Sequence, residues 1–233
     1  MTMLNDFLPT SATWGVLLTL AAFALGTFIN RKTGKAIFNP LLLGTVFVIV
    51  FLSVCSIPYE DYKASASPVS YLLLPATVSL AVPLYEKWDL LRKNVLAIVM
   101  GILAGTLASL GSVLVLALLL KLDHSQYITL LPKSVTTAIS MDVSHELGGI
   151  AALTGAIVIL TGILGALMAE TVCKVCHITH PIARGIGIGT AAHAVGTSKA
   201  LQMGEVEGAM SGLAVAVAGV MTAILCPIFS SFI

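Results

Sequence analysis

The apolar runs of this sequence are long enough to cross a lipid bilayer, and they constrain its fold more than any other feature. A transmembrane helix needs about 20 predominantly apolar residues, and such runs recur along the chain. Of the 233 residues, 58% are hydrophobic and only 10% are charged, whereas a soluble domain carries about 25% charged residues. We therefore expect an all-α membrane protein that the lipid bilayer solvates. Uninterrupted spans are predicted at 12–29, 39–57, 95–120, 150–172 and 207–231.

Residues 70–85 are also apolar, but they contain helix breakers. Pro75 and Pro83 each remove a backbone N–H donor from a helix. Irregular backbone at membrane depth must line protein or water, because lipid offers it no hydrogen bonds. The freed carbonyls, beside the hydroxyl of Thr77, can bind a cation or a substrate hydroxyl. A kinked helix with a structural role explains the same residues, and both interpretations stay open.

Residues 182–201 form a second interrupted segment. Gly185, Gly187 and Gly189 recur at every second position, which argues against a regular helix through them because glycine destabilises helix interiors. We predict that the helix breaks at Gly185 and Gly187.

Polar residues follow these glycines. On a helix, Thr190, His193 and Thr197 would share one face. Hydrogen bonding between helices is a common use of such residues in membranes, but a histidine beside a glycine break and several hydroxyls favours a binding site. Proton coupling through His193 is part of this hypothesis. The substrate-binding residues predicted here are Gly189, Thr190, His193, Thr197 and Ser198.

The two interrupted segments resemble each other, and a helix with a GxxxG pair follows each of them. Paired interruptions point to inverted repeats and a midplane site in secondary transporters, while the glycine pairs let helices approach closely. We expect one domain, 1–233, made of repeats 12–120 and 132–231. At one constant offset, Thr77, Ala81 and Val82 match Thr190, Ala194 and Val195, and the glycine pairs are Gly101 with Gly105 and Gly208 with Gly212.

The segment 132–149 is short and mixed in polarity. The cationic loops place the N-terminus outside and the C-terminus inside, which gives seven crossings if 132–149 enters and leaves by the same face. If 132–149 crosses the membrane instead, the protein has eight membrane segments and the orientation of its second half is reversed. We prefer the re-entrant topology in a multi-pass protein of the inner (plasma) membrane. The first residues lack the positive n-region of a secretory signal, so we expect the first apolar run to be retained.

The beginning of 132–149 offers a possible carboxylate cradle. Pro132 suits the first turn of a helix, whose free N–H groups and positive dipole end attract anions. A helix start with an interfacial lysine is the alternative, and composition does not separate the two. The predicted substrate-binding residues are Lys133, Ser134, Thr136 and Thr137, beside Thr77 of the first repeat.

Other charged residues have a simpler interpretation. On a helix, Asp142 and Glu146 would share a face, with His145 close by. Ionisable groups buried in membranes are usually functional, but solvation in the headgroup region explains these residues and Glu170 better.

The sequence from Cys173 to His177 matches a haem-attachment pattern and, with His180, offers zinc ligands at short spacing. A short interfacial loop explains the stretch better. We expect no metal site, no cofactor and no enzymatic activity. The net charge is +1 and no basic block occurs, which argues against nucleic-acid binding.

Ordered motifs cover nearly the whole chain. The second half reads LLPKSVTTAIS, HELGGIAALTGAIVILTGILGA, PIARGIGIGTAAHAVGTSKA and EGAMSGLA, and the first half contains NPLLLG and LLPATVSLAVPLYE. This set, over residues 13–231, closely resembles the LrgB/CidB family of membrane proteins. Ala138, Ala192 and Lys199 stand where the family often has proline, serine and arginine. Lysine lacks the planar fork of arginine, so these departures affect substrate identity.

The resemblance implies a fold of the bile-acid symporter and cation/proton antiporter type, with two inverted repeats whose broken helices cross. It implies a site where the breaks meet, with 133–137 nearby. Family members are described as antiholin-like or as regulators of murein hydrolase export and cell lysis. Many act beside a smaller holin-like LrgA/CidA partner, and a related plastid translocator moves glycolate and glycerate. The implied site residues are Pro75, Ala76 and Thr77 with Gly189, Thr190 and His193.

Two functions are therefore expected. The first is a secondary transporter of a small organic anion, such as pyruvate, glycolate or glycerate, that works by alternating access as a possible homodimer. The alternative is an antiholin-like regulator that acts with an LrgA/CidA partner.

Overall fold

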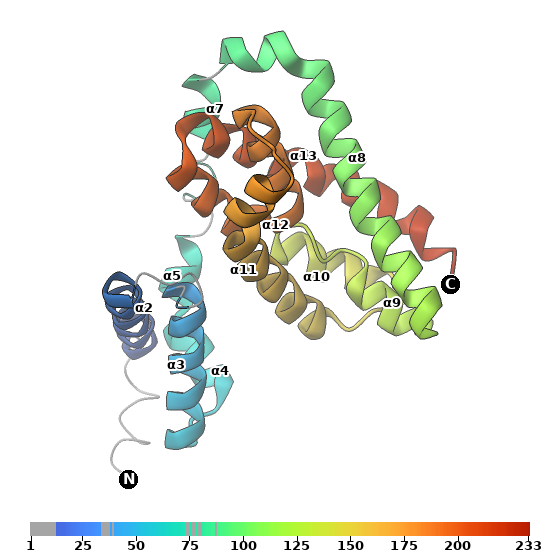
Figure 1. The fold of residues 1–233 in the computed structure, drawn as a ribbon. Helices are drawn as coiled ribbons and strands as arrows, with labels where there is room; N and C mark the ends of the chain where they lie inside the picture. The colour runs from blue at the N-terminus through green and yellow to red at the C-terminus, as the bar shows by residue number, and fades with distance from the viewer. Residues whose placement is uncertain are drawn as a thin grey trace. The chain divides into compact units, whose positions relative to one another are not determined.

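The structure, a computed structural model, describes residues 13–33, 38, 40–72, 75, 78, 81–86 and 88–233. Every regular element in this part of the chain is a helix (Figure 1), which confirms the predicted all-α class. The chain divides into two compact units, Met1–Ser79 and Leu80–Ile233.

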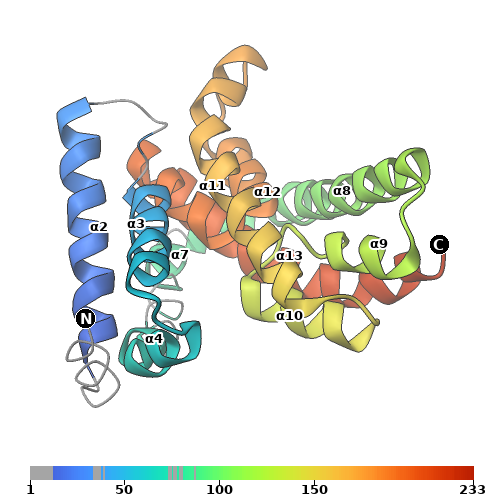
Figure 2. The same cartoon turned by 90° about the horizontal axis from the view of Figure 1, so that it is seen from below.

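The first unit contains two apolar helices that lie side by side, α2 and α3 (Figure 2). The ring of Trp14 lies 6.0 Å from that of Tyr62, and the hydroxyls of Thr19 and Tyr62 are 2.8 Å apart. These contacts hold α4 against the start of α2. The helices are α2 (Trp14–Thr33), α3 (Pro40–Cys55), α4 (Tyr59–Ser65) and α5 (Ser67–Tyr71).

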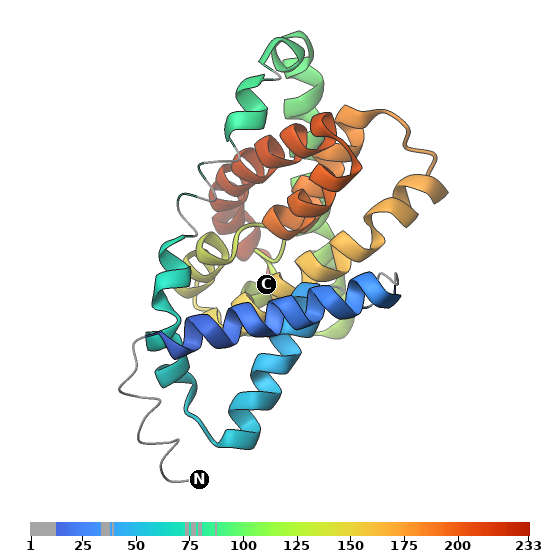
Figure 3. The same cartoon turned by 90° about the vertical axis from the view of Figure 1, so that its left-hand side faces the viewer.

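The second unit is built around α12 (Pro181–Met203) and α13 (Glu205–Ser230), which are joined by Gly204 alone. The pair is drawn in orange and red in Figure 3. Two long helices pack on α12, namely α8 (Trp88–Leu120) and α11 (Ala151–Val175). The short helices of the unit are α7 (Ala81–Glu86), α9 (His124–Leu130) and α10 (Thr137–Glu146).

Two buried apolar clusters hold these helices together. In the first, Ile98 and Ile102 of α8 meet α12 and α13. In the second, Leu110 of α8 meets Tyr127 of α9 and the end of α13. The hydroxyl of Tyr127 donates a 2.9 Å hydrogen bond to the carbonyl of Phe229, so the buried ring keeps a partner for its polar end.

The outward surfaces of the long helices are apolar. Leu96, Leu119 and Val175 are each more than 70% exposed, which a water-soluble surface avoids over such areas. Four described helices are long and apolar enough to cross a bilayer: Trp14–Thr33, Arg92–Leu120, Ala151–Val175 and Glu205–Ser230.

These four helices coincide with predicted spans. The fifth predicted span, 39–57, is a helix of 16 residues, Pro40–Cys55, which is apolar but shorter than a typical crossing. The total of seven or eight membrane segments and the inverted repeats stay predictions. Helix α10 has 10 residues and is about 15 Å long, half the hydrocarbon thickness of about 30 Å. It is too short to span, and the re-entrant path of 132–149 also stays a prediction.

The predicted break at Gly185 and Gly187 is wrong. Helix α12 continues through both residues, and within it only His193 leaves helical geometry, at φ 42° and ψ −140°. Gly185 serves helix packing, because a Cβ there would lie 2.5 Å from the carbonyl oxygen of Glu207 on α13, whereas a Cβ on Gly187 would meet nothing within 4 Å.

The predicted break in the first repeat lies partly outside the described residues, which include Pro75 but not Thr77. Pro83 is the third residue of α7. A first-turn N–H has no partner within its helix, so proline is tolerated there and Pro83 does not interrupt this helix.

Candidate functional site

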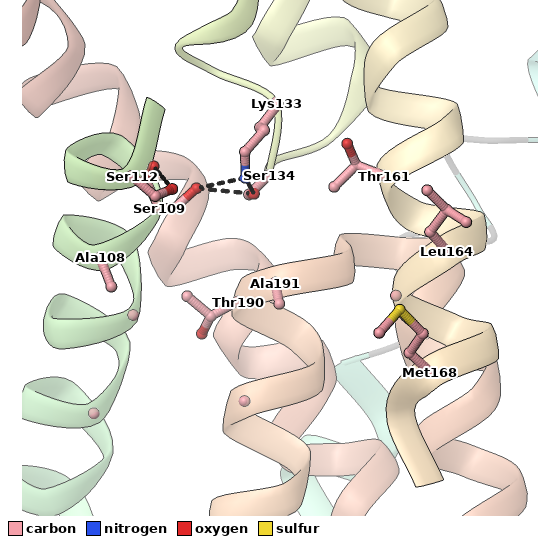
Figure 4. A pocket seen from close by; sticks show the side chains of 14 residues that line it. Ala108, Ser109, Ser112, Lys133, Ser134, Thr161, Leu164, Met168, Thr190 and Ala191 are labelled. Carbon is pink, nitrogen blue, oxygen red and sulfur yellow. Dashed lines mark hydrogen bonds between the residues drawn. The ribbon is translucent and has the colours of Figure 1, made fainter. Parts of the chain in front are cut away.

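A cavity of about 570 Å³ lies in the second unit, between α8, α11, α12 and the loop that joins α9 to α10. On α11, Thr161, Gly165 and Met168 follow each other at helical spacing and therefore face the same way. On α8 the lining residues are small, which leaves room for the cavity. Figure 4 shows the polar side chains at the cavity, and these are Ser109, Ser112, Lys133, Ser134, Thr161 and Thr190.

Lys133 is the basic side chain that lines this cavity. Its Nζ donates to Ser109 Oγ at 3.2 Å and to Ser134 Oγ at 3.1 Å, and the two hydroxyls are hydrogen-bonded to each other at 2.9 Å (Figure 4). Lys133 lies in the loop between α9 and α10, and burial lowers the pKa of its amine. Within the described residues, no carboxylate lines the cavity or pairs with Lys133.

The loop that carries Lys133 is not the first turn of a helix, so that expectation for Pro132 is wrong. Helix α10 begins later, at Thr137, with Thr136 as its N-cap residue. The hydroxyl of Ser140 donates to the carbonyl of Pro132 at 2.6 Å, which holds the loop folded back over the start of α10. Ser134 reaches the cavity as a result, whereas Thr136 and Thr137 are not among the lining residues.

Thr190 supplies an unused hydrogen-bonding group. Its side chain is 5% exposed, and its hydroxyl is buried without a partner in the described structure. A buried unsatisfied hydroxyl costs roughly 1–3 kcal/mol, and a hydrogen bond from a polar ligand in the neighbouring cavity would offset that cost. Gly105 of α8 makes the close approach of Thr190 possible, because a Cβ there would lie 2.8 Å from Thr190 Cγ2.

His193 does not line this cavity. Its ring is 3% exposed, and Nε2 lies 3.0 Å from the carbonyl of Val158 on α11. Gly162 makes room for the ring, since a Cβ there would lie 2.6 Å from His193 Cε1. The contact between His193 and the Val158 carbonyl therefore joins α12, at its break, to α11.

The expected shared face of Thr190, His193 and Thr197 is also wrong. The break at His193 turns the backbone between them, so the three side chains diverge. Thr190 lines the cavity, His193 meets α11, and Thr197 bonds to Ser211 of α13 at 2.9 Å.

The remaining predicted residues occupy other places. Ser198 is exposed and donates to the carbonyl of Val195. Gly189 lies against the carbonyl of Ser211 on α13, and Gly187 lines the cavity. Sequence reasoning missed Ser109 and Thr161, whose only signal is that each is a polar residue within an apolar span.

The charged residues that the structure describes outside the cavity are paired or exposed. Glu170 forms a 2.6 Å ion pair with Lys199 and a 3.9 Å pair with Lys174, and it is partly exposed; its expected place in the headgroup region stays a prediction. Asp142 and Glu146 are exposed on α10.

Comparison with known proteins gives a consistent family signal. The sequence model of the LrgB-like family matches residues 19–232. Proteins named "Antiholin-like protein LrgB" from Bacillus mycoides (strain KBAB4), Bacillus cereus (strain B4264) and Bacillus anthracis (strain CDC 684 / NRRL 3495) are each 36% identical over 221 residues. The matches cover 94% of this chain and 96% of each relative. No solved structure matches significantly.

Proposed function

Because this chain belongs to the LrgB-like family, we propose that it is a multi-pass protein of the plasma membrane with an antiholin-like role in restraining cell lysis. The observation that carries this proposal is the 36% identity to antiholin-like proteins over 94% of the chain. The names of these relatives favour the second of the two functions expected from the sequence. A holin-like LrgA/CidA protein is the partner that this role requires.

Deletion of the gene in its native cell tests this role. We expect faster lysis and higher extracellular murein hydrolase activity, followed over time by culture turbidity and by zymography, and we expect the wild-type gene to restore both. Unchanged lysis and hydrolase activity in the deletion strain would refute the antiholin-like role.

A second candidate function is the transport of a small organic carboxylate, of the pyruvate, glycolate or glycerate class. The specific observation in its favour is the cavity itself, which Lys133 and Thr190 both line, together with the Thr190 hydroxyl, which is buried without a partner in the described structure. An amine without a carboxylate partner attracts an anion, and a buried free hydroxyl favours a ligand that can hydrogen-bond to it. The two groups come from different elements, so movement of α12 against α8 would change the site.

Uptake of radiolabelled pyruvate, glycolate and glycerate into proteoliposomes tests this function. We expect saturable uptake that Lys133→Gln abolishes, because glutamine keeps hydrogen bonding but removes the charge. Ser198→Ala is the matched control, because the hydroxyl of Ser198 is exposed and outside the cavity. Absence of saturable uptake for all three acids would exclude transport of this class.

Expressing Lys133→Gln in the deletion strain distinguishes the two functions. If lysis control requires the bound anion, Lys133→Gln will reproduce the deletion phenotype. If lysis control depends on a partner surface, Lys133→Gln will restrain lysis as the wild type does.

A further inference from the structure

The hydrogen bonds around Lys133 suit two protonation states. An ammonium group donates hydrogen bonds to hydroxyl oxygens, whereas a neutral amine can also accept a hydrogen bond from a hydroxyl, whose hydrogen rotates to suit. Ser109 and Ser134 are the side-chain partners of Lys133 Nζ in the described structure. A carboxylate partner would instead favour the charged form. The site thus holds the amine without imposing a charge on it.

The described titratable groups on the helices that pack around the cavity do not offset a positive charge on Lys133. On α11, Glu170 is nine residues beyond Thr161 and is paired with Lys199. On α12, His193 faces the Val158 carbonyl, and Arg184 pairs with Glu207 of α13 at 3.8 Å.

The described titratable groups of α8, α9 and α10 also leave a charge on Lys133 without an offset. On α8, Lys93 is the nearest charged residue before Ser109 in sequence, 16 residues or about 24 Å of helix away, and Asp89 and Arg92 are farther. On α9, His124 and Tyr127 bond to carbonyls at the end of the chain. The titratable residues of α10 are all exposed: Asp142, His145 and Glu146.

We propose that Lys133 is the residue at which anion binding and proton binding are coupled. With the cavity empty, no carboxylate offsets a charge on the amine, so the amine gives up its proton more readily than it does with an anion bound. When a monovalent anion enters, Nζ takes one proton from solvent, and the partly buried ammonium and the anion neutralise each other. When the anion leaves, the proton leaves with it, so one complete cycle moves no net charge. This inference rests on the anion-binding function proposed above, and it replaces His193 as the proton-carrying residue.

The energetic reason is the cost of a lone charge in a cavity. A buried ammonium without a partner and a buried anion without a partner are each unfavourable, but each one offsets the other. By linkage, the anion then raises the affinity for the proton by the same factor by which the proton raises the affinity for the anion.

Calorimetry of pyruvate binding to the full-length protein in detergent tests the proposal. Titrations at one pH, in two buffers of different ionisation enthalpy, give the number of protons taken up per bound anion. We expect net proton uptake, of at most about one proton per anion, for the wild type and none for Lys133→Arg, because arginine stays protonated. Lys174→Arg is the matched control, since Lys174 is highly exposed, and it should take up protons as the wild type does.

A second measurement needs no variant. Pyruvate stays ionised from neutral to alkaline pH, so the pH dependence of its affinity reports on the protein. Above the pKa of the free amine, we expect the affinity to fall about tenfold per pH unit, because only the protonated fraction binds.

The outcomes separate the two proposals. Pyruvate binding without proton uptake, or uptake that persists in Lys133→Arg, would overturn the role of Lys133 and leave anion binding intact. Loss of uptake in His193→Gln together with retained uptake in Lys133→Arg would overturn it in favour of His193. If none of the three acids binds or is transported, the transport function itself fails and this inference fails with it.

Discussion

Replacing Gly105 by alanine should disturb the packing of α8 against α12 at the candidate site. The added Cβ would lie 2.8 Å from Thr190 Cγ2 and 3.4 Å from Thr190 Cβ, and carbon atoms pack without strain at about 3.5–4.0 Å. The neighbour is a short β-branched side chain with few rotamers, so the backbone must shift. Overpacking of this kind costs roughly 1–3 kcal/mol.

Gly111→Ala is the matched control for this change. Gly111 lies on the same helix, and a Cβ there meets nothing within 4 Å. Both substitutions gain the helix propensity of alanine over glycine, about 1 kcal/mol, so this term cancels in the comparison. We expect the Gly105→Ala protein to be less stable than the Gly111→Ala protein by about 1–3 kcal/mol.

A double-mutant cycle locates the cause. Thr190→Ser removes the Cγ2 methyl group and keeps the hydroxyl, so it should recover most of the stability lost in Gly105→Ala. The measurement is denaturant-induced unfolding in detergent, followed by tryptophan fluorescence. Equal stability of the Gly105→Ala and Gly111→Ala proteins, or no recovery with Thr190→Ser, would refute the reasoning.

Three further changes test other contacts. Thr197→Val removes the buried hydrogen bond to Ser211 and should destabilise the protein by about 1–3 kcal/mol in the same unfolding assay; a smaller loss would mean that the bond adds little. Disrupting the partly exposed Lys199–Glu170 pair by Lys199→Gln should cost less than about 1 kcal/mol, and a loss that does not shrink at high salt would contradict a surface ion pair. Burial lowers the pKa of Lys133 from 10.5, so the unfolded chain holds this proton to higher pH than the folded chain. The anion-free protein should therefore gain stability as the pH rises toward 10.5, more in the wild type than in Lys133→Gln.

Much of the helical framework could be predicted from the sequence because it depends on local properties. A run of apolar residues such as 150–172 must form a helix in lipid, where each backbone group needs a partner within its own segment. The family signal is also local, since it consists of ordered motifs. For the same reason Lys133 and Thr190 could be selected as polar residues in an apolar chain.

Apart from the helix start expected at Pro132, the failures concern the break predicted within 182–201. Glycine permits irregular backbone, but it equally permits close helix packing, and the two uses of Gly185 look alike in a sequence. The neighbouring carbonyl of Glu207 on α13 decides between them. The break falls on His193 because Gly162 and the Val158 carbonyl, both on α11, receive its ring.

The amino-acid sequence alone determined the helical class, the apolar spans and the family of this chain, because apolar runs and ordered motifs carry that information residue by residue. Only the tertiary structure decided which polar groups meet. Lys133, Ser109 and Thr190 come from a loop and two helices that are far apart in sequence. Their convergence depends on the close approach of α8 and α12 at Gly105 and Thr190, which a linear pattern does not encode.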